Sequence, residues 1–360
     1  MLRACLKADL MVSKMQKKLE DFLSEKLNQT EAKQRLASVV KVLATTVIQV
    51  ANLVEKAPLA GQLGKLDHEN VQGEQQATLD LLTNDCFVAN LQACEAVAAI
   101  VSEELEQAIL LSKDVSKPNY LAVFDPLDGS SNIEVNVAVG SIFSFLKAPI
   151  GRAAQTVDFL QKGTEQVLAG YAIYGSSTIL VLTFGEGVHV FTLDRANGEF
   201  VLTQQNMRVP EDTKEFAINT SNARFWEPPI QQYINECEAG STGVRGKDFN
   251  MRWIASMVAD VHRIMMRGGI YLYPKDNKLP AKAGRLRLLY ELNPMSWLIE
   301  QAGGKSSTGR ERVLEITPSE IHQRAPIIIG SKNEVARVIS YYQALDNSNL
   351  IKNDMINNSD

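Results

Sequence analysis

The sequence has few cysteines, no close pair of them and no excess of positive charge. Its four cysteines form no CxxC motif or other metal-ligand spacing, so we predict reduced thiols at Cys5, Cys86, Cys94 and Cys237. The formal net charge is −5, from 37 Lys and Arg against 42 Asp and Glu, which gives no basic field that would attract nucleic acid or acidic lipid. An anionic ligand would therefore need a local cluster of basic residues.

The sequence also lacks a recognisable membrane or export signal. We find no apolar span of 18 residues, and charged residues stand where a signal peptide has its apolar core: Asp9, Lys14, Lys17 and Lys18. The composition, 45% hydrophobic and 22% charged over 360 residues, is that of an ordinary globular enzyme with room for two domains. We therefore expect a cytoplasmic protein that binds neither nucleic acid nor membrane.

The most informative stretch, residues 121–136, reads LAVFDPLDGSSNIEVN. An apolar, strand-like run ends in Asp125, Pro126 breaks the strand, and Asp128 begins a turn. Two carboxylates thus leave a buried strand together, and carboxylates are hard ligands suited to Mg²⁺ or Mn²⁺. The next residues can turn backbone N–H groups toward an anion: Gly129, Ser130 and Ser131. By itself an Asp-x-x-Asp spacing is more often a solvated turn, and that alternative stays open here.

Apolar periodicity predicts the elements on both sides of this stretch. We expect helices over residues 1–60 and 78–100, a loop able to move at 58–76, and an antiparallel meander between 135 and 202. In the second half we expect strands at 216–219, 270–273 and 326–329 and helices at 230–238, 251–266, 294–302 and 333–342. The predicted organisation is an N-terminal domain with the metal site over residues 1–205, a C-terminal substrate domain over 206–345 and a disordered, Asn-rich tail over 346–360.

The string DPLDGSSN after a strand resembles the signature of the lithium-sensitive, Mg²⁺-dependent phosphatase superfamily. Three further runs resemble class I fructose-1,6-bisphosphatases in that family's order: MVADVHR at 257–263, GGIYLYP at 268–274 and RLRLLYELNPMSWLIEQAGG at 285–304. The resemblance implies an α/β fold of alternating helix and sheet layers with two subdomains, commonly assembled as a homotetramer. It also implies hydrolysis of the 1-phosphate of fructose 1,6-bisphosphate by metal-activated water, with sedoheptulose-1,7-bisphosphatase activity as the nearest alternative.

The same resemblance implies a metal site. It makes five acids ligands of two or more Mg²⁺ ions per subunit, with Mn²⁺ as an alternative and the Leu127 carbonyl helping: Glu103, Glu104, Asp125, Asp128 and Glu291. Asp80 matches a residue that works with the Glu104 position to orient and deprotonate the attacking water. Without the resemblance, we would interpret Glu103 and Glu104 as the solvated acidic end of the predicted helix, and Glu291 as an ordinary carboxylate at a strand end. Such a group of acids needs divalent cations, because its carboxylates would otherwise repel one another and would repel a phosphate.

The two phosphates are implied to bind separately. The hydrolysed phosphate is received at Asp128, Gly129, Ser130 and Ser131, and the distal phosphate at Asn219, Tyr273, Arg285, Arg287 and an Arg252 borrowed from a neighbouring subunit. Three positions depart from the family's pattern, since Asn222 and Trp253 stand where tyrosine is frequent and Arg285 where lysine is common. These departures concern distal-phosphate recognition and leave the hydrolysed phosphate unaffected.

For regulation the resemblance is only partial. Members that bind AMP carry a Thr-Gly-Glu stretch and a Lys-Tyr pair, whereas this chain has Gln29, Thr30 and Glu31, and then Asn119 before Tyr120. Inhibition by AMP is therefore an open hypothesis from the sequence. Redox control of the chloroplast type is not expected, because no pair of cysteines occupies an inserted loop.

Overall fold

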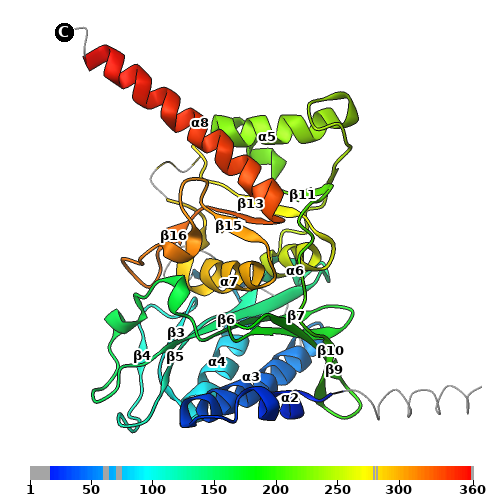
Figure 1. Ribbon diagram of the computed structural model, residues 1–360. Coiled ribbons are helices and arrows are strands. Elements are labelled where there is room, and N and C mark those ends of the chain that lie inside the picture. The colour runs from blue at the N-terminus through cyan, green and yellow to red at the C-terminus, as the bar shows by residue number, and fades with distance from the viewer. Residues whose placement is uncertain (1–16, 60–64, 70–74, 279, 281–282, 358–360) are drawn as a thin grey trace, which may run out of the picture.

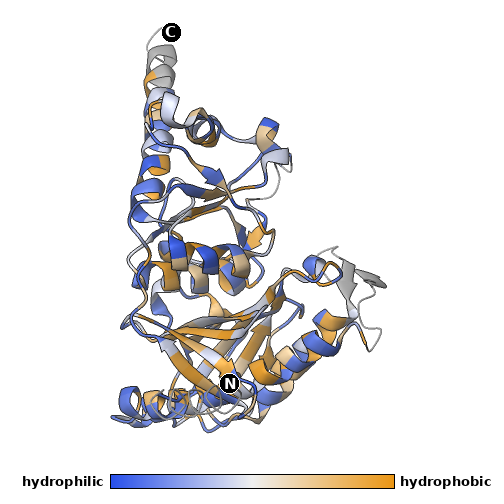
Figure 2. Cartoon of the chain, turned by 90° about the vertical axis from the view of Figure 1, so that its right-hand side faces the viewer, coloured by the Kyte–Doolittle hydropathy of each residue, from blue (hydrophilic) through white to orange (hydrophobic). Residues whose placement is uncertain are grey.

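The computed structural model describes residues 17–59, 65–69, 75–278, 280 and 283–357. Layers of helix alternate with an eight-stranded and a five-stranded sheet (Figure 1). Apolar residues gather between these layers and polar residues face outward (Figure 2). The predicted layered α/β class is confirmed. Cys5, Asp9 and Lys14 lie outside the described residues.

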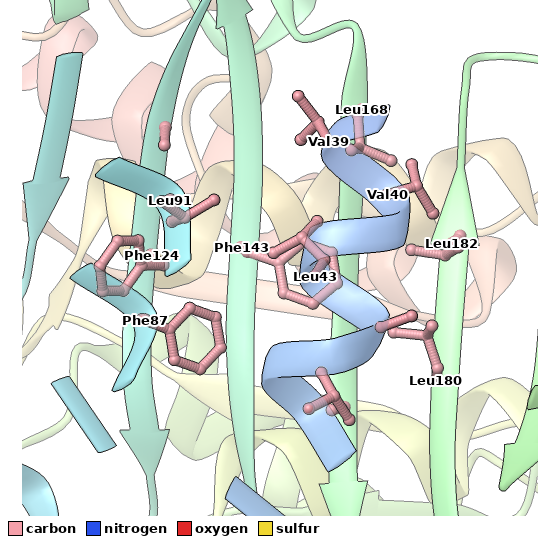
Figure 3. Close-up of a cluster of buried hydrophobic side chains, with 14 of the residues drawn as sticks. Val39, Val40, Leu43, Phe87, Leu91, Phe124, Phe143, Leu168, Leu180 and Leu182 are labelled. Carbon is pink, nitrogen blue, oxygen red and sulfur yellow. The ribbon is translucent and has the colours of Figure 1, made fainter. Parts of the chain in front are cut away.

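Two helices begin the described chain, α2 (Leu19–Lys26) and α3 (Glu31–Lys56). Thr30 caps α3, because its Oγ1 accepts a hydrogen bond from the Lys33 N–H at 3.2 Å. Apolar residues at helical spacing along α3 are buried: Leu36, Val39, Val40, Leu43, Val47 and Val50. Figure 3 shows Val39, Val40 and Leu43 in one core cluster with Phe143, Leu168, Leu180 and Leu182 of the large sheet.

Helix α3 is also long and apolar enough to cross a membrane, judged by length and composition alone. The expectation that the sequence holds no such span is therefore wrong. The apolar face of α3 is covered by the sheet, however, as in the core helix of a soluble protein. Packing within the fold accounts for the hydrophobicity of this helix.

Two predicted elements near the start of the chain have the wrong type. The predicted loop at 58–76 contains an antiparallel pair, β1 (Lys65–Glu69) and β2 (Gln75–Ala77). The predicted helix over 78–100 ends earlier, as α4 (Thr78–Ala93), and Val97–Ser102 forms strand β3. All six residues of β3 are buried, and a short run that is buried on both faces has no periodicity to distinguish strand from helix.

The large sheet has the order β10-β9-β8-β7-β6-β5-β3-β4. Its other strands are β4 (Ile109–Leu110), β5 (Tyr120–Asp128), β6 (Val139–Lys147), β7 (Leu168–Tyr174), β8 (Thr178–Thr183), β9 (Val188–Asp194) and β10 (Glu199–Gln204). Strands β5 to β10 pair antiparallel in sequence, which confirms the predicted meander. Strands β3 and β5 are parallel, so their carboxyl ends reach the same edge of the sheet.

The second half of the chain builds the remaining layers. The smaller sheet contains β11 (Glu215–Ala217), β12 (Asn250–Met251), β13 (Ile270–Tyr273), β15 (Lys305–Ser307) and β17 (Ile327–Gly330). Helices α6 (Met257–Arg267) and α7 (Asn293–Gln301) lie between the two sheets, and α5 (Pro228–Ala239) and α8 (Lys332–Asn357) cover the outer face of the smaller one (Figure 1). A separate pair, β14 (Leu286–Arg287) and β16 (Arg324–Ala325), flanks α7 in sequence.

Two of the predicted helices have wrong bounds. Helix α6 begins at Met257 instead of Met251, because Ala255 adopts a left-handed conformation (φ 67°) and turns the chain just before the helix. Helix α8 continues to Asn357, so the predicted disordered tail is helical over residues 346–357. Arg310 holds the start of this extension, with its Nε 2.9 Å from Oδ2 of Asp346.

Candidate active site

Three acidic side chains from two distant parts of the chain meet at one edge of the large sheet. Asp125 and Asp128 lie at the end of β5, and Glu291 comes from a π-helical turn, η6 (Leu288–Leu292). One carboxylate oxygen from each lies within 4.8 Å of the other two, and all three side chains are buried. One cation placed among these oxygens could contact all three residues.

Glu103 approaches this acidic cluster from the neighbouring strand. The Glu103 N–H donates to the Phe124 carbonyl at 3.1 Å, so its side chain follows the end of β3 next to Asp125. Arg287 joins the two sides, since its Nη1 lies 2.5 Å from Oε1 of Glu103 and 3.9 Å from Oε2 of Glu291. The Arg287 N–H also donates to Oε2 of Glu291 at 2.6 Å.

Arg287 is therefore found beside the predicted metal ligands, whereas the sequence predicts it among the substrate contacts. The cause is local: η6 follows Arg287 directly and folds Glu291 back onto it. Only 5% of Arg287 is exposed, so this guanidinium supplies a buried positive charge to the acids.

The acidic cluster is electrostatically costly in the absence of cations. Burial raises the pKa of Asp125, and the charges of Glu103, Asp128 and Glu291 raise it further. Burial also raises the pKa of Asp128, against hydrogen bonds from the start of α6 that lower it. Burial and the charge of Glu103 raise the pKa of Glu291 to about 8. Buried carboxylate oxygens form a donor set that fits Mg²⁺ or Mn²⁺.

The start of α6 holds Asp128 from the opposite side. Oδ2 of Asp128 accepts hydrogen bonds from Ser256 Oγ at 3.1 Å and from the Val258 N–H at 2.9 Å. The sequence analysis did not identify Ser256 or Val258, although both lie in or next to the MVADVHR run that it quoted. A serine one residue before a helix was the available signal.

The turn after Asp128 is the predicted phosphate cradle. Gly129 has φ 78°, and a Cβ atom at this position would lie 2.7 Å from Ser256, so only glycine fits without strain. The chain then enters a short 3₁₀ turn, η1 (Ser130–Asn132). Ser130 is half-buried and Ser131 is exposed, directly beside the acidic cluster in sequence.

Asp80 and Glu104 come from adjacent elements. Asp80 is buried in the first turn of α4, and one turn later Asn84 accepts a hydrogen bond from Ser102 Oγ at 2.7 Å. Because residues four apart share a helix face, Asp80 lies on the face of α4 that meets the end of β3. Glu104 follows that end and is half-buried. The arrangement is compatible with joint action on one water molecule.

A second group of predicted residues gathers beyond the ends of β11 and β13. Asn219 and Tyr273 line one small cavity together with Asn222 and Asp276. Arg285 reaches the same place, with its Nη2 3.2 Å from Oδ2 of Asp276. The structure thus brings together Asn219, Tyr273 and Arg285. Of these, Arg285 is a position that departs from the family's pattern.

Two more positions that bear on the distal phosphate, Arg252 and the departure from the family's pattern at Trp253, are neighbours in the chain. Arg252 follows β12, and its N–H donates to the Phe216 carbonyl at 2.8 Å while its side chain is exposed. The Trp253 ring stacks on that of Tyr271, with centroids 5.6 Å apart and planes 9° apart, and lies 6.1 Å from the ring of Tyr273. Trp253 therefore acts here as a packing residue, and Arg252 projects from the surface.

A separate cavity of about 420 Å³ lies between α2, α3 and the edge of the sheet that carries Tyr120. Asn119 and Tyr120 line it, together with Lys26, Lys33 and Lys147. The sequence analysis missed these lysines because they are far apart in the chain. Three lysines against one acid in the lining, Glu186, suit an anionic ligand, and inhibition by AMP at this cavity stays an open hypothesis.

Comparison with known proteins gives consistent matches over most of the chain. Residues 17–205 match the family model described as fructose-1-6-bisphosphatase, N-terminal domain, and residues 209–343 match its C-terminal domain. The chain is 53% identical over 320 residues to fructose-1,6-bisphosphatase class 1 of Halorhodospira halophila, which covers 88% of this chain and 95% of that protein. It is 57% identical over 294 residues to the protein of the same name from Hydrogenophilus thermoluteolus, with 80% and 82% covered. The crystal structure of Leishmania major fructose-1,6-bisphosphatase in holo form has a TM-score of 0.84 and 36% identity, covering 91% of this chain and 99% of that one.

Proposed function

Because the chain belongs to the fructose-1,6-bisphosphatase family, we propose that its acidic cluster carries the hydrolysis of D-fructose 1,6-bisphosphate to fructose 6-phosphate and phosphate. One observation supports this site above all. Asp125, Asp128 and Glu291 meet within 4.8 Å of one another, directly before the turn of Gly129. Cation ligands and a glycine turn suited to an anion are thus adjacent, as metal-assisted phosphate transfer requires.

The residues of the acidic cluster would hold Mg²⁺, with two or more ions per subunit and Mn²⁺ as an alternative. The ligands are the carboxylates of Asp125, Asp128 and Glu291, together with Glu103, Glu104 and the Leu127 carbonyl. When bound, the cations neutralise the phosphate oxygens and lower the pKa of the attacking water. Asp125 also accepts the Leu127 N–H at 3.0 Å, which fixes the backbone that presents this carbonyl.

Asp80 and Glu104 orient the water and accept its proton in this proposal. Asp80 lies in the first turn of α4, and Glu104 follows the end of β3, the strand parallel to β5. The Gly129 N–H and the hydroxyls of Ser130 and Ser131 receive the 1-phosphate, next to Asp128.

The distal phosphate binds beside the small cavity that Asn219 and Tyr273 line, where Arg285 pairs with Asp276 of the cavity wall. Arg252 of a neighbouring subunit completes this site within a homotetramer, which agrees with its exposure on the single chain. The planar guanidinium suits phosphate oxygens because it donates two charge-assisted hydrogen bonds at once. Asn222 contributes an amide to the same cavity in place of a phenol.

We also propose a soluble, cytoplasmic enzyme, since the apolar face of α3 is buried within the fold. The division of the chain into an N-terminal metal domain and a C-terminal substrate domain near residues 205 and 206 is retained as part of the proposal. It separates the large sheet, which ends at Gln204, from the smaller sheet, which begins at Glu215.

A steady-state assay tests this function and its nearest alternative. Purified protein is given fructose 1,6-bisphosphate or sedoheptulose 1,7-bisphosphate, each with and without Mg²⁺, and phosphate release is measured. We expect Mg²⁺-dependent turnover with a higher kcat/KM for the six-carbon sugar. A preference of about tenfold for the seven-carbon sugar, roughly 1.4 kcal/mol, would make the substrate assignment wrong. Equal kcat/KM for fructose 1-phosphate would remove the need for a distal site.

A further inference from the structure

Residues 250–256 connect the smaller sheet to the acidic cluster. At one end the Arg252 N–H donates to the Phe216 carbonyl of β11, which fixes the start of the segment on the smaller sheet. At the other end Ser256 donates to Asp128 of the large sheet and precedes the first residue of α6. The segment is short, so its shape determines how Arg252, which the proposed function assigns to the distal-phosphate site of a neighbouring subunit, is placed relative to the acidic cluster of its own chain.

The middle of this segment has a strained backbone. Ala255 has φ 67°, in the left-handed region that residues with a Cβ atom rarely adopt. Among the described residues, the two other non-glycine positions with positive φ, Asn136 and Asn206, are both asparagine, which tolerates this conformation. An alanine there persists only if its surroundings hold it in place.

Two side chains hold the peptide groups around Ala255. Asp260 accepts the Ala255 N–H at 3.1 Å through Oδ2 and the Ile254 N–H at 3.0 Å through Oδ1. Asn132, from the turn after Asp128, donates its Nδ2 to the Ala255 carbonyl at 3.0 Å. Asp260 is 1% exposed and sits in the first turn of α6, where a carboxylate also suits the helix dipole.

We infer that Asp260 is a positioning residue for the reaction: it holds the strained turn at residues 254–256, and thereby sets the position of Ser256 and of the start of α6 against Asp128. This inference rests on the proposed function, because it gives the turn the task of aligning the metal ligand Asp128. A role limited to helix capping would change the stability of the protein and leave its kinetic constants alone. A positioning role changes the metal requirement and the rate, since small displacements of reacting groups slow enzymes strongly.

The test compares three variants with the wild type: Asp260→Asn, Ala255→Gly and the double variant. Asparagine is isosteric but turns an N–H₂ group toward one of the two peptide N–H groups, so the turn loses part of its support. We expect Asp260→Asn to lower kcat roughly tenfold or more and to raise the Mg²⁺ concentration for half-maximal activity. Glycine adopts positive φ without strain, so the double variant should regain most of the lost kcat.

Asp194→Asn is the matched control. Asp194 also accepts a backbone N–H, that of Ala196 at 3.0 Å, but in an exposed turn of the meander. We expect it to leave kcat and the Mg²⁺ requirement unchanged. The inference is overturned if Asp260→Asn lowers only the unfolding temperature, or if the double variant is no faster than Asp260→Asn alone.

Two further measurements separate this inference from the proposed function. If the wild type does not hydrolyse the bisphosphate, the proposed function fails. The present inference is then tested by Mg²⁺ binding instead: the unfolding temperature of each variant is measured as Mg²⁺ is added, and the Mg²⁺ concentration that gives half of the full increase is compared between variants. If Asp260→Asn does not fold, Asn132→Ala replaces it, because it removes the other support of Ala255 from an accessible turn. An unchanged Mg²⁺ requirement in Asn132→Ala then contradicts the inference, and a raised one that Ala255→Gly reverses supports it.

Discussion

Replacing Glu291 by glutamine should make the protein more stable without metal and less active with it. The pKa of Glu291 is about 8 in the folded chain, mainly through burial, against an ordinary value of 4.5. The unfolded chain therefore releases this proton at lower pH than the folded chain does. Between about pH 4.5 and 8 the unfolded state binds fewer protons, so the free energy of unfolding falls as the pH rises. One pKa unit corresponds to about 1.4 kcal/mol, which gives a loss of about 3 kcal/mol by pH 7.

The assay is denaturant unfolding in the presence of a chelator, at several pH values from 4.5 to 8, for the wild type and Glu291→Gln. The variant cannot titrate at this position, so its stability relative to the wild type should increase by about 3 kcal/mol between pH 4.5 and 7. With saturating Mg²⁺ the order should reverse, because the wild type gains more from the cation. Glu238→Gln, an exposed acid on α5, is the control and should follow the wild type. Parallel pH profiles for the wild type and Glu291→Gln would refute the reasoning.

Four further outcomes are expected. Gly129→Ala should abolish turnover while the protein still folds, because its Cβ would lie 2.7 Å from Ser256 at a φ of 78°; full activity would contradict the proposed turn. Arg252→Ala should raise KM for the bisphosphate about tenfold or more and leave the KM of a monophosphate unchanged, as measured by steady-state kinetics. Glu334→Gln should lower the free energy of unfolding by about 3–5 kcal/mol in a denaturant titration, because it breaks a buried ion pair in which Nη2 of Arg245 lies 2.6 and 2.7 Å from the two carboxylate oxygens; its kcat should not change. On the open hypothesis that AMP binds the lysine-lined cavity, AMP at millimolar concentration inhibits phosphate release, and no change in a titration would dismiss that hypothesis.

The end of β5 could be predicted from the sequence because its signals are local. An apolar run, a proline and an Asp-Gly pair identify a strand end and a turn without any knowledge of the rest of the chain. The structure confirms the strand and shows Gly129 in the conformation that favours glycine. The prediction that Pro126 breaks the strand is wrong, because β5 continues to Asp128 with a register shift between Asp125 and Asp128 that accommodates the proline. The meander was predictable for the same reason, since each strand is bounded by its own turn residues.

Glu291 could not be found from local signals. Its neighbours Tyr290 and Leu292 are buried, and no spacing in the sequence connects it to Asp125. It reaches the cluster through the π-helical turn at Leu288–Leu292, a rare conformation that apolar periodicity does not predict. Only the resemblance to a family suggested its role.

Other errors have tertiary causes. Val97–Ser102 has the composition of either a buried strand or a buried helix, and parallel pairing with β5 decides between them. Helix α6 was predicted to start too early because a left-handed alanine is not foreseeable from its identity. The ion pair of Arg287 with Glu103 joins residues far apart in the chain, so no local signal predicts it, and the substrate contact of Arg287 stays a prediction.

The central claim is that the acidic cluster works only when divalent cations occupy it. The most direct measurement is the initial rate of phosphate release from fructose 1,6-bisphosphate. It is made first after a chelator has removed the metal and again after Mg²⁺ is restored, for both the wild type and Asp125→Asn. The account predicts that chelation abolishes turnover, that Mg²⁺ restores it in the wild type, and that it does not in Asp125→Asn. Full turnover by the chelated wild type, or by Asp125→Asn, would contradict it.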